Sequence, residues 1–359
     1  MHNNIPQAKP HFEVLDGLRG LAALSIVIFH LYEFIIPDYT LSPIGHGYLA
    51  VDFFFCLSGF VIGYAYDERA SQMGIMKFFR NRFIRLHPMV VWGSVIGLLG
   101  YIFDPFTGIA MVAEAGWGKI ILAFVSSLFL IPFPLLPGRF NGLFPLNTPA
   151  WSLFMEYIIN IFYGLVLLRL PKRWLLVFLA TSVVCLMAVA RERGWIITGW
   201  DAPTFFDGFA RVGFSFLAGL VIFRFRLIIQ HRLNFLFLAA LLLGVFIFPH
   251  RDKDWLTEML LVIVVLPLIV SLGAGATVRG PLKRFCTFTG RLSYPLYMTH
   301  IWAIWIFGNY LNKIKPDQAM IYWAATGVFI GSCLLAWLVL RFYDEPVRAW
   351  LAKKWSTRE

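Results

Sequence analysis

Long apolar runs separated by short polar segments recur from one end of the chain to the other. Each is about 17 to 25 residues long, enough for a helix to cross the roughly 30 Å hydrocarbon core of a bilayer. We mark ten runs as membrane-spanning helices, so the pattern predicts an all-α polytopic membrane protein. The ten runs are residues 18–36, 49–66, 88–104, 150–169, 173–190, 209–225, 233–249, 256–276, 292–312 and 319–341.

An eleventh apolar stretch, residues 117–136, ends differently. Pro132, Pro134 and Pro137 lie at its end, where proline interrupts a helix. We interpret it as a re-entrant segment that enters the membrane and leaves on the same side. The distribution of basic residues supports ten membrane crossings. Ten spans with both termini in the cytoplasm put most Lys and Arg inside, whereas an eleventh crossing would move the C-terminal basic clusters outside.

Composition agrees with a lipid environment. Of the 359 residues, 59% are hydrophobic and 14% are charged, whereas a soluble domain is about half apolar and a quarter charged. We see no internal repeat and no long linker. Residues 1–359 are therefore predicted to form a single transmembrane domain, with a cytoplasmic N-terminus (1–17) and a basic cytoplasmic tail (342–359).

The 31 basic residues outnumber the 20 acidic residues. In this chain the excess indicates loops held at a cytoplasmic membrane surface, so we expect membrane lipids as partners and no nucleic acid. The cysteines are scattered without metal-binding or redox spacing, so we expect neither a disulfide framework nor a zinc site. They are Cys56, Cys185, Cys286 and Cys333.

A few ionisable side chains lie inside the predicted spans, where each costs about 2.5 to 3.5 kcal/mol. Arg19 lies near the start of the first span, and His30 follows roughly 16 Å further along the helix axis. Asp52 lies near the outer end of the second span. By the same rise, His30 and Glu156 each lie about 9 Å from the outer boundary. We therefore expect His30, Asp52 and Glu156 to meet in one layer.

This layer suits acyl transfer to an alcohol. A histidine can accept the proton of a hydroxyl, while a carboxylate fixes its tautomer and stabilises the imidazolium. Asp52 or Glu156 would orient His30 in this way. A second buried histidine, His300, is expected lower in the membrane than His30, where it would line a channel between the two faces. The alternative for each residue is a polar group satisfied by a neighbouring helix.

Basic residues recur three apart in the segment Lys77–Pro88, which we predict as a cytoplasmic loop. In helical geometry Arg82 and Arg85 would share a face, and such a face binds phosphates well. The alternative is an orientation signal that contacts lipid headgroups. With a histidine near the outer side, these residues suggest a nucleotide-bearing donor that enters from the cytosol and an acceptor across the membrane.

In these motifs the chain resembles the acyltransferase 3 family of membrane proteins, whose members acylate bacterial surface polysaccharides, peptidoglycan, antibiotics and related glycosides. The most specific motif is an arginine and a histidine with ten residues between them, here Arg19 and His30. Ala50 and Met298 replace a glycine and a leucine common in the family, and neither change removes a reactive group. The further motifs are Val51–Phe55 with Ser58–Phe60, Arg82 with Arg85, Trp151–Leu153 with Glu156, and Ser293–Tyr294 with Tyr297 and His300.

The resemblance implies that His30 is catalytic, that Arg19 is its partner, and that Arg82 and Arg85 belong to the donor site. We expect Tyr297 and His300 beside the donor. The implied reaction moves an acyl group, acetyl by default, from cytosolic acyl-CoA to a hydroxyl of a carbohydrate or glycolipid acceptor at the outer face of the inner membrane. Acyl-CoA is then a co-substrate, and direct transfer needs no metal.

Two other functions fit the same pattern. Buried His, Asp, Glu and Arg in ten helices would also suit a proton-coupled transporter of a lipid-linked or small glycan. Such a carrier would move its solute without loss of a thioester. The other alternative is a non-catalytic subunit of a surface-glycan assembly system. The sequence leaves open the acceptor, the acyl chain length, an acyl-enzyme intermediate, the oligomeric state and the carboxylate that partners His30.

Overall fold

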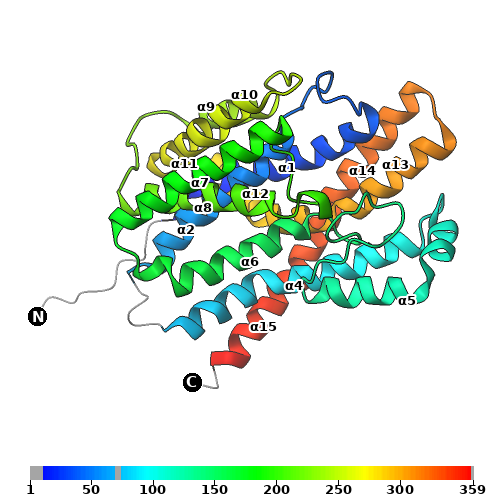
Figure 1. Cartoon of the computed structure of the whole chain (residues 1–359), viewed down its shortest axis with the longest axis horizontal. Coiled ribbons are helices and arrows are strands. Elements are labelled where there is room, and N and C mark those ends of the chain that lie inside the picture. Colours follow the sequence, from blue (N-terminus) through cyan, green and yellow to red (C-terminus); the bar gives the residue numbers. More distant parts are fainter. Residues whose placement is uncertain (1–10, 69–73, 357–359) are drawn as a thin grey trace, which may run out of the picture.

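The structure, a computed structural model, describes residues 11–68 and 74–356, so the ends of the predicted N-terminal segment and tail lie outside the described residues. Most helices lie side by side along the long dimension of the molecule (Figure 1). The α-helices are α1 (Glu13–Ile35), α2 (Ala50–Tyr66), α4 (Ile75–Ile102), α5 (Gly108–Leu128), α6 (Ala150–Leu165), α7 (Lys172–Arg193), α8 (Asp207–Arg224), α9 (Phe235–Phe246), α10 (Trp255–Leu260), α11 (Leu266–Gly275), α12 (Gly280–Thr299), α13 (Ile301–Ile314), α14 (Gln318–Val339) and α15 (Glu345–Ser356).

Within the described residues, eight helices are long and apolar enough to cross a membrane. The all-α prediction is therefore confirmed, and the eight helices agree with a multi-pass membrane protein. The predicted ten crossings and the cytoplasmic position of both termini stay predictions. By length and composition, the eight are Glu13–Ile35, Gly47–Tyr66, Ile75–Ile102, Gly108–Leu128, Ala150–Arg169, Lys172–Arg193, Trp255–Gly275 and Gln318–Trp355.

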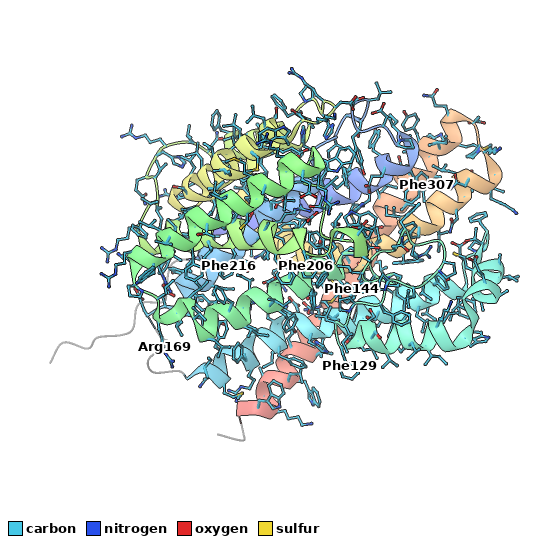
Figure 2. The ribbon with its side chains drawn as sticks, viewed as in Figure 1. Phe129, Phe144, Arg169, Phe206, Phe216 and Phe307 are labelled. Carbon is cyan, nitrogen blue, oxygen red and sulfur yellow. The ribbon has the colours of Figure 1, made fainter. Side chains whose placement is uncertain are left out.

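Large apolar side chains occupy the outside of the bundle as well as its interior (Figure 2). Phe144 and Phe216 are almost fully buried, whereas Phe129 and Phe206 are 67% and 80% exposed. An extensive apolar exterior is unfavourable in water, but it is the surface that a lipid environment requires. The distribution of side chains therefore supports a bundle embedded in a bilayer.

Glycines allow two helix pairs at the centre of the bundle to pack closely. A Cβ atom on Gly59 of α2 would lie 1.9 Å from the carbonyl oxygen of Phe216 in α8. A Cβ on Gly219 of α8 would lie equally close to a carbonyl of α2. In the second pair, a Cβ on Gly20 of α1 would lie 2.4 Å from the Cβ of Thr289 in α12. Small residues let membrane helices approach closely, and these contacts fix the helices that carry the candidate site.

Helix α4 begins at Ile75, not at residue 88, so the predicted loop Lys77–Pro88 is helical. Pro88 lies inside the helix, and tyrosines from neighbouring segments satisfy the carbonyl groups beside it. Tyr294 donates to the oxygen of Leu86 at 2.6 Å, and Tyr343 donates to that of Pro88 at 3.1 Å. The helix continues through Pro88, and these two bonds tie it to its neighbours at the proline.

The predicted span 292–312 is two helices, α12 and α13, that meet at His300. Pro295 lacks a backbone donor one turn before the junction, which weakens the helix there. Helix α12 also starts at Gly280, so His300 lies further from its beginning than the predicted span implied. His300 lies beside His30, with their rings stacked and the centroids 5.4 Å apart, while the prediction that it lies lower in the membrane stays a prediction.

Helix α5 covers part of the predicted re-entrant segment, residues 117–136. Gly116, with φ of 71°, interrupts its helical geometry. The helix ends beside the last third of α4, where the hydroxyls of Ser127 and Ser94 are 2.7 Å apart. After α5 the chain packs against the same part of α4, because the backbone of Leu146 contacts Gly97. Although α5 is long enough to cross, these contacts favour the re-entrant interpretation (Figure 1).

Two further predicted segments differ from the structure. Helix α9 has 12 residues, or roughly 18 Å, and is shorter than the predicted span 233–249. The predicted tail 342–359 is helical as far as Ser356, because α14 continues through a π-helical turn, Leu340–Asp344, into α15. Helix α15 packs beside α4, so this end of the chain is part of the bundle.

Candidate active site

Two cavities lie next to each other inside the bundle. The arginine cavity, about 160 Å³, contains Arg19 and is lined by α1, α2, α4, α6 and α12. The histidine cavity, about 620 Å³, contains His30 and is lined mainly by α1, α6, α13 and the loops beside them. Val51 and Tyr297 line both cavities. These two side chains are therefore a shared wall.

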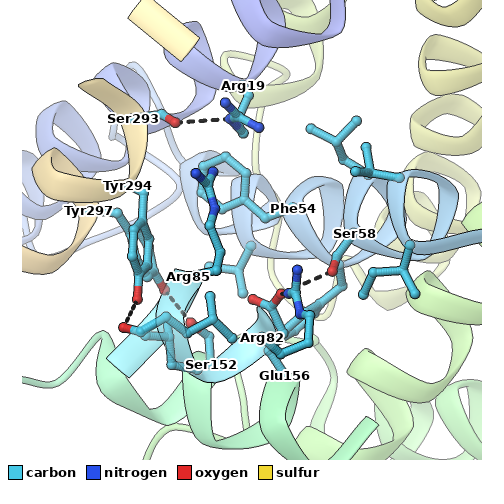
Figure 3. Close-up of a pocket in the computed structure, with 17 residues that line it drawn as sticks. Arg19, Phe54, Ser58, Arg82, Arg85, Ser152, Glu156, Ser293, Tyr294 and Tyr297 are labelled. Carbon is cyan, nitrogen blue, oxygen red and sulfur yellow. Dashed lines mark hydrogen bonds and ion pairs between the residues drawn. The ribbon is translucent and has the colours of Figure 1, made fainter. Parts of the chain in front are cut away.

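Three arginines and one glutamate are the charged residues that line the arginine cavity (Figure 3). The carboxylate of Glu156 binds Arg82 and also accepts a hydrogen bond from Ser58 at 3.0 Å. This pair leaves Arg19 and Arg85 without a carboxylate from the cavity lining. The cavity therefore carries a net positive charge.

Arg19 joins α1 to α12. Its Nε donates to the hydroxyl of Ser293 at 3.0 Å, and its Nη2 donates to the carbonyl of Gly290 at 2.6 Å. Asp16, one turn earlier on α1, lies 2.9 Å from the same nitrogen. These contacts hold the guanidinium in the cavity wall, on the helix that carries His30.

Arg85 differs from the other two arginines. No hydrogen bond or ion pair joins it to another residue in the described part of the chain. Its guanidinium extends into the cavity toward Arg19 (Figure 3). A guanidinium away from water is stabilised by an anion, and its planar fork of donors matches phosphate oxygens. The arginine cavity can therefore bind a phosphate or pyrophosphate.

The carboxylate of Glu33, one turn after His30 on α1, binds His30 Nδ1 in the histidine cavity. Tyr39 donates to the other oxygen of Glu33 at 2.7 Å. Burial and the nearby Glu33 raise the pKa of Tyr39 far above its usual value, so this hydroxyl stays a donor. A carboxylate at Nδ1 favours the tautomer that leaves Nε2 free to accept a proton. This is the arrangement of a general base.

Neither Asp52 nor Glu156 contacts His30, contrary to the prediction. Asp52 is fully buried and accepts a hydrogen bond from Arg211 of α8 at 2.6 Å. Glu156 lies in the arginine cavity. Equal depth along parallel helices does not decide which way a side chain points around each helix axis. The predicted meeting of the two carboxylates with His30 is therefore wrong. Glu33 was missed, although its three-residue spacing from His30 was the available signal.

Tyr297 lines both cavities, whereas His300 lines neither and packs beside it, with ring centroids 6.1 Å apart. His300 is fully buried, and its Nδ1 donates to the carbonyl of Leu296 at 3.1 Å. Its Nε2 has no hydrogen-bond partner among the described residues. The Tyr297 hydroxyl is 2.8 Å from that of Ser152. The structure thus brings His300 to His30 and puts Tyr297 in the shared wall, while their predicted role in donor binding stays a prediction.

These features make one chemical sequence available. A cavity with a net positive charge adjoins, through the shared wall, a cavity with a carboxylate-oriented histidine. A molecule with an anionic head and a long, thin arm can occupy the first cavity and present its far end to the second. A hydroxyl beside His30 could then lose its proton as it attacks that end.

Known proteins provide an independent comparison. The family model of acyltransferase 3, described as an acyltransferase domain, matches residues 12–341. This range includes every residue of the candidate site and confirms the resemblance found in the sequence. No solved structure matches the chain significantly.

Three curated relatives share parts of the sequence. "Protein 2 in picA locus" of Rhizobium radiobacter is 35% identical over 188 residues, covering 50% of this chain and 95% of the relative. "Acyltransferase MdmB" of Streptomyces mycarofaciens is 25% identical, covering 50% of this chain and 46% of the relative. A Staphylococcus aureus (strain COL) protein named "Putative O-acetyltransferase" is 24% identical, covering 93% of this chain and 57% of the relative.

The alignments span about half the length of the last two relatives, so their names identify a class of reaction and not an acceptor. The family match, in contrast, extends over nearly the whole chain and includes the arginine and histidine motif. The chain therefore belongs to the acyltransferase 3 family and is an acyltransferase that transfers groups other than aminoacyl groups.

Proposed function

We propose that the protein is an O-acyltransferase that moves a small acyl group, acetyl by default, from cytosolic acyl-CoA to a hydroxyl of a carbohydrate or glycolipid acceptor at the outer face of the inner membrane. One observation carries this proposal. Val51 and Tyr297 are shared by a cavity with an unpaired guanidinium and a cavity with a histidine–carboxylate pair. The name of the staphylococcal relative supports acetyl as the group.

Acyl-CoA fits the arginine cavity in part. The volume of the arginine cavity, about 160 Å³, is below the roughly 300 to 1,000 Å³ of pockets that enclose a whole ligand. The cavity would therefore hold the narrow pantetheine arm, with donor phosphates near Arg85. Arg82 and Arg19 would add positive charge, although both already bond to protein groups. Tyr297 and His300 would lie beside the thioester end of the arm.

The acceptor would bind in the histidine cavity with one hydroxyl near His30. Nε2 of His30 accepts the hydroxyl proton while the oxygen attacks the thioester carbonyl. The carbon–sulfur bond then breaks, and the leaving CoA thiolate accepts the proton from the imidazolium of His30. The charge on Glu33 stabilises the imidazolium between these steps. General-base catalysis of this kind contributes about 10²- to 10⁴-fold to the rate.

The test is acceptor-dependent release of CoA by the purified protein in detergent. Acetyl-CoA is supplied with a panel of cell-surface glycans, and the acylated product is identified by mass spectrometry. The parent and a His231→Ala control should release CoA in step with product, because His231 binds the carbonyl of Leu272 away from both cavities. His30→Ala should lose the reaction.

Equal activity in the parent and His30→Ala would contradict the proposed mechanism. Uptake of an intact glycan by proteoliposomes, with no CoA released, would instead support a carrier. Circular dichroism and gel-filtration profiles of the three proteins must match, so that a loss of activity is not a loss of fold.

A further inference from the structure

A group of metal-binding side chains lies beside the histidine cavity but outside both cavity linings. It consists of His46, in the loop before α2, His250, in the loop before α10, and Glu258 of α10. One ligand atom from each lies within 4.8 Å of the others, and the three residues are 0%, 5% and 0% exposed. Because His46 is far from the other two in sequence, a search for closely spaced ligands does not find the group.

His46 presents a free nitrogen to the group. Its Nδ1 donates to the carbonyl of Phe248 at 2.9 Å, so the lone pair is on Nε2. Buried Nε2 has no hydrogen-bond partner among the residues described and lies 3.7 Å from an oxygen of Asp254. A backbone carbonyl at one ring nitrogen is the usual way to orient a histidine that binds metal through the other.

His250 and Glu258 complete the arrangement. Neither ring nitrogen of His250 has a hydrogen-bond partner within the described ranges, and its Nε2 lies 3.5 Å from Oε1 of Glu258. Tyr48 donates to that oxygen, and the backbone amide of Ile196 donates to the other at 2.5 Å. The carboxylate is therefore held in place, while both imidazoles leave buried polar atoms unsatisfied. An unsatisfied buried polar atom is unfavourable, and a bound metal ion would satisfy both imidazoles.

We propose that His46, His250 and Glu258 form a structural zinc site. The nearest candidate for a fourth ligand is Asp254, whose carboxylate oxygen lies 3.7 Å from His46 Nε2 and accepts a hydrogen bond from the backbone amide of Arg251. Zinc binds nitrogen and oxygen ligands tetrahedrally at about 2.0 to 2.2 Å, which puts neighbouring ligand atoms roughly 3.3 to 3.5 Å apart. The 3.5 Å separation between His250 and Glu258 is in this range. The ligand atoms of all three residues lie within 4.8 Å of one another, so metal binding would draw the side chains closer together. Two imidazoles with two carboxylates favour zinc over calcium or magnesium, which prefer oxygen ligands alone.

The site would clamp the outer loops over the histidine cavity. It would join the loop of His46 to the loop of His250 and to α10. Tyr39 lies in the first loop, and its ring centroid is 5.9 Å from that of His250. The same tyrosine binds Glu33, the partner of His30. The metal would therefore hold these loops in position beside the histidine cavity and take no part in the transfer itself.

Zinc content tests the proposal directly. The tag-free parent is treated with a chelator, dialysed against zinc chloride and then buffer, and analysed by inductively coupled plasma mass spectrometry. We expect about one zinc per chain. The double variant His46→Gln/His250→Gln should bind at least about tenfold more weakly, and His231→Gln, a histidine outside the group, should keep the metal. A parent without retained zinc, or a double variant that retains as much as the parent, would overturn the site.

Thermal unfolding of the parent supplies a test that needs no variant. Zinc should raise the Tm of the chelator-treated parent, and EDTA should reverse the rise. Magnesium and calcium at the same concentration should have little effect. An unchanged Tm with zinc would contradict a structural site even if the double variant fails to fold. Neither measurement uses acyl transfer, so this proposal and the proposed function can fail separately.

Discussion

At the residue scale, the proposed general base in the histidine cavity consists of His30 together with Glu33. Glu33→Gln keeps the size of the side chain but removes the charge that stabilises the imidazolium. We predict that kcat falls about 10²-fold, measured as CoA release at saturating donor and acceptor. Asp38→Asn is the control, because Asp38 is exposed in the following loop and binds Thr40. A Glu33→Gln rate within twofold of the parent would mean that the carboxylate has no role in proton transfer.

The three arginines of the arginine cavity differ from one another at the same scale. Arg85 has its donors free for a ligand, whereas Arg82 and Arg19 bind protein groups. Loss of a hydrogen bond to a charged group costs about 1.5 to 3 kcal/mol, so Arg85→Ala should raise KM for acetyl-CoA roughly 10- to 100-fold. Arg279→Ala, an exposed arginine at the start of α12, should leave KM unchanged. If the two variants have the same KM, the donor phosphates bind elsewhere.

At the element scale, helix α2 is held against α8 by glycine. Gly59→Ala would bring a methyl group onto a backbone carbonyl that cannot move freely. We predict a loss of about 1–3 kcal/mol in stability, seen as a lower Tm of the solubilised protein. In contrast, Gly331→Ala places its methyl in open space on α14 and should not lower the Tm. Equal Tm values for the two variants would show that α2 and α8 can separate at little cost.

The elements also show how far the sequence alone reaches. Helices α2, α7 and α8 were predicted within a few residues, because each is a long, mainly apolar run. The basic first half of α4 was missed because apolar length was the criterion, and the break at His300 was missed because the apolar pattern continues across it. The motif residues were named from the sequence and their roles stay predictions, but the partners of His30 and Asp52 were not named. Glu33 and Arg211 depend on side-chain directions that hydrophobic length does not determine.

At the scale of the whole molecule, one helix connects the two halves of the proposed reaction. Helix α1 carries Arg19 in one cavity and His30 in the other, roughly 16 Å apart along its axis. If α1 crosses the bilayer, donor and acceptor approach from opposite sides. The acyl group would then cross on the arm of its carrier, past Val51 and Tyr297, and no acyl-CoA would have to leave the cytosol.

The most direct test of this account is transfer across a sealed membrane. The protein is reconstituted in proteoliposomes with radiolabelled acetyl-CoA only inside and a membrane-impermeant glycan acceptor, identified in the detergent assay, only outside. We predict labelled acceptor outside the parent vesicles and none with His30→Ala. If label appears only when donor and acceptor share one compartment, the two cavities do not form a path across the membrane and the central claim is wrong.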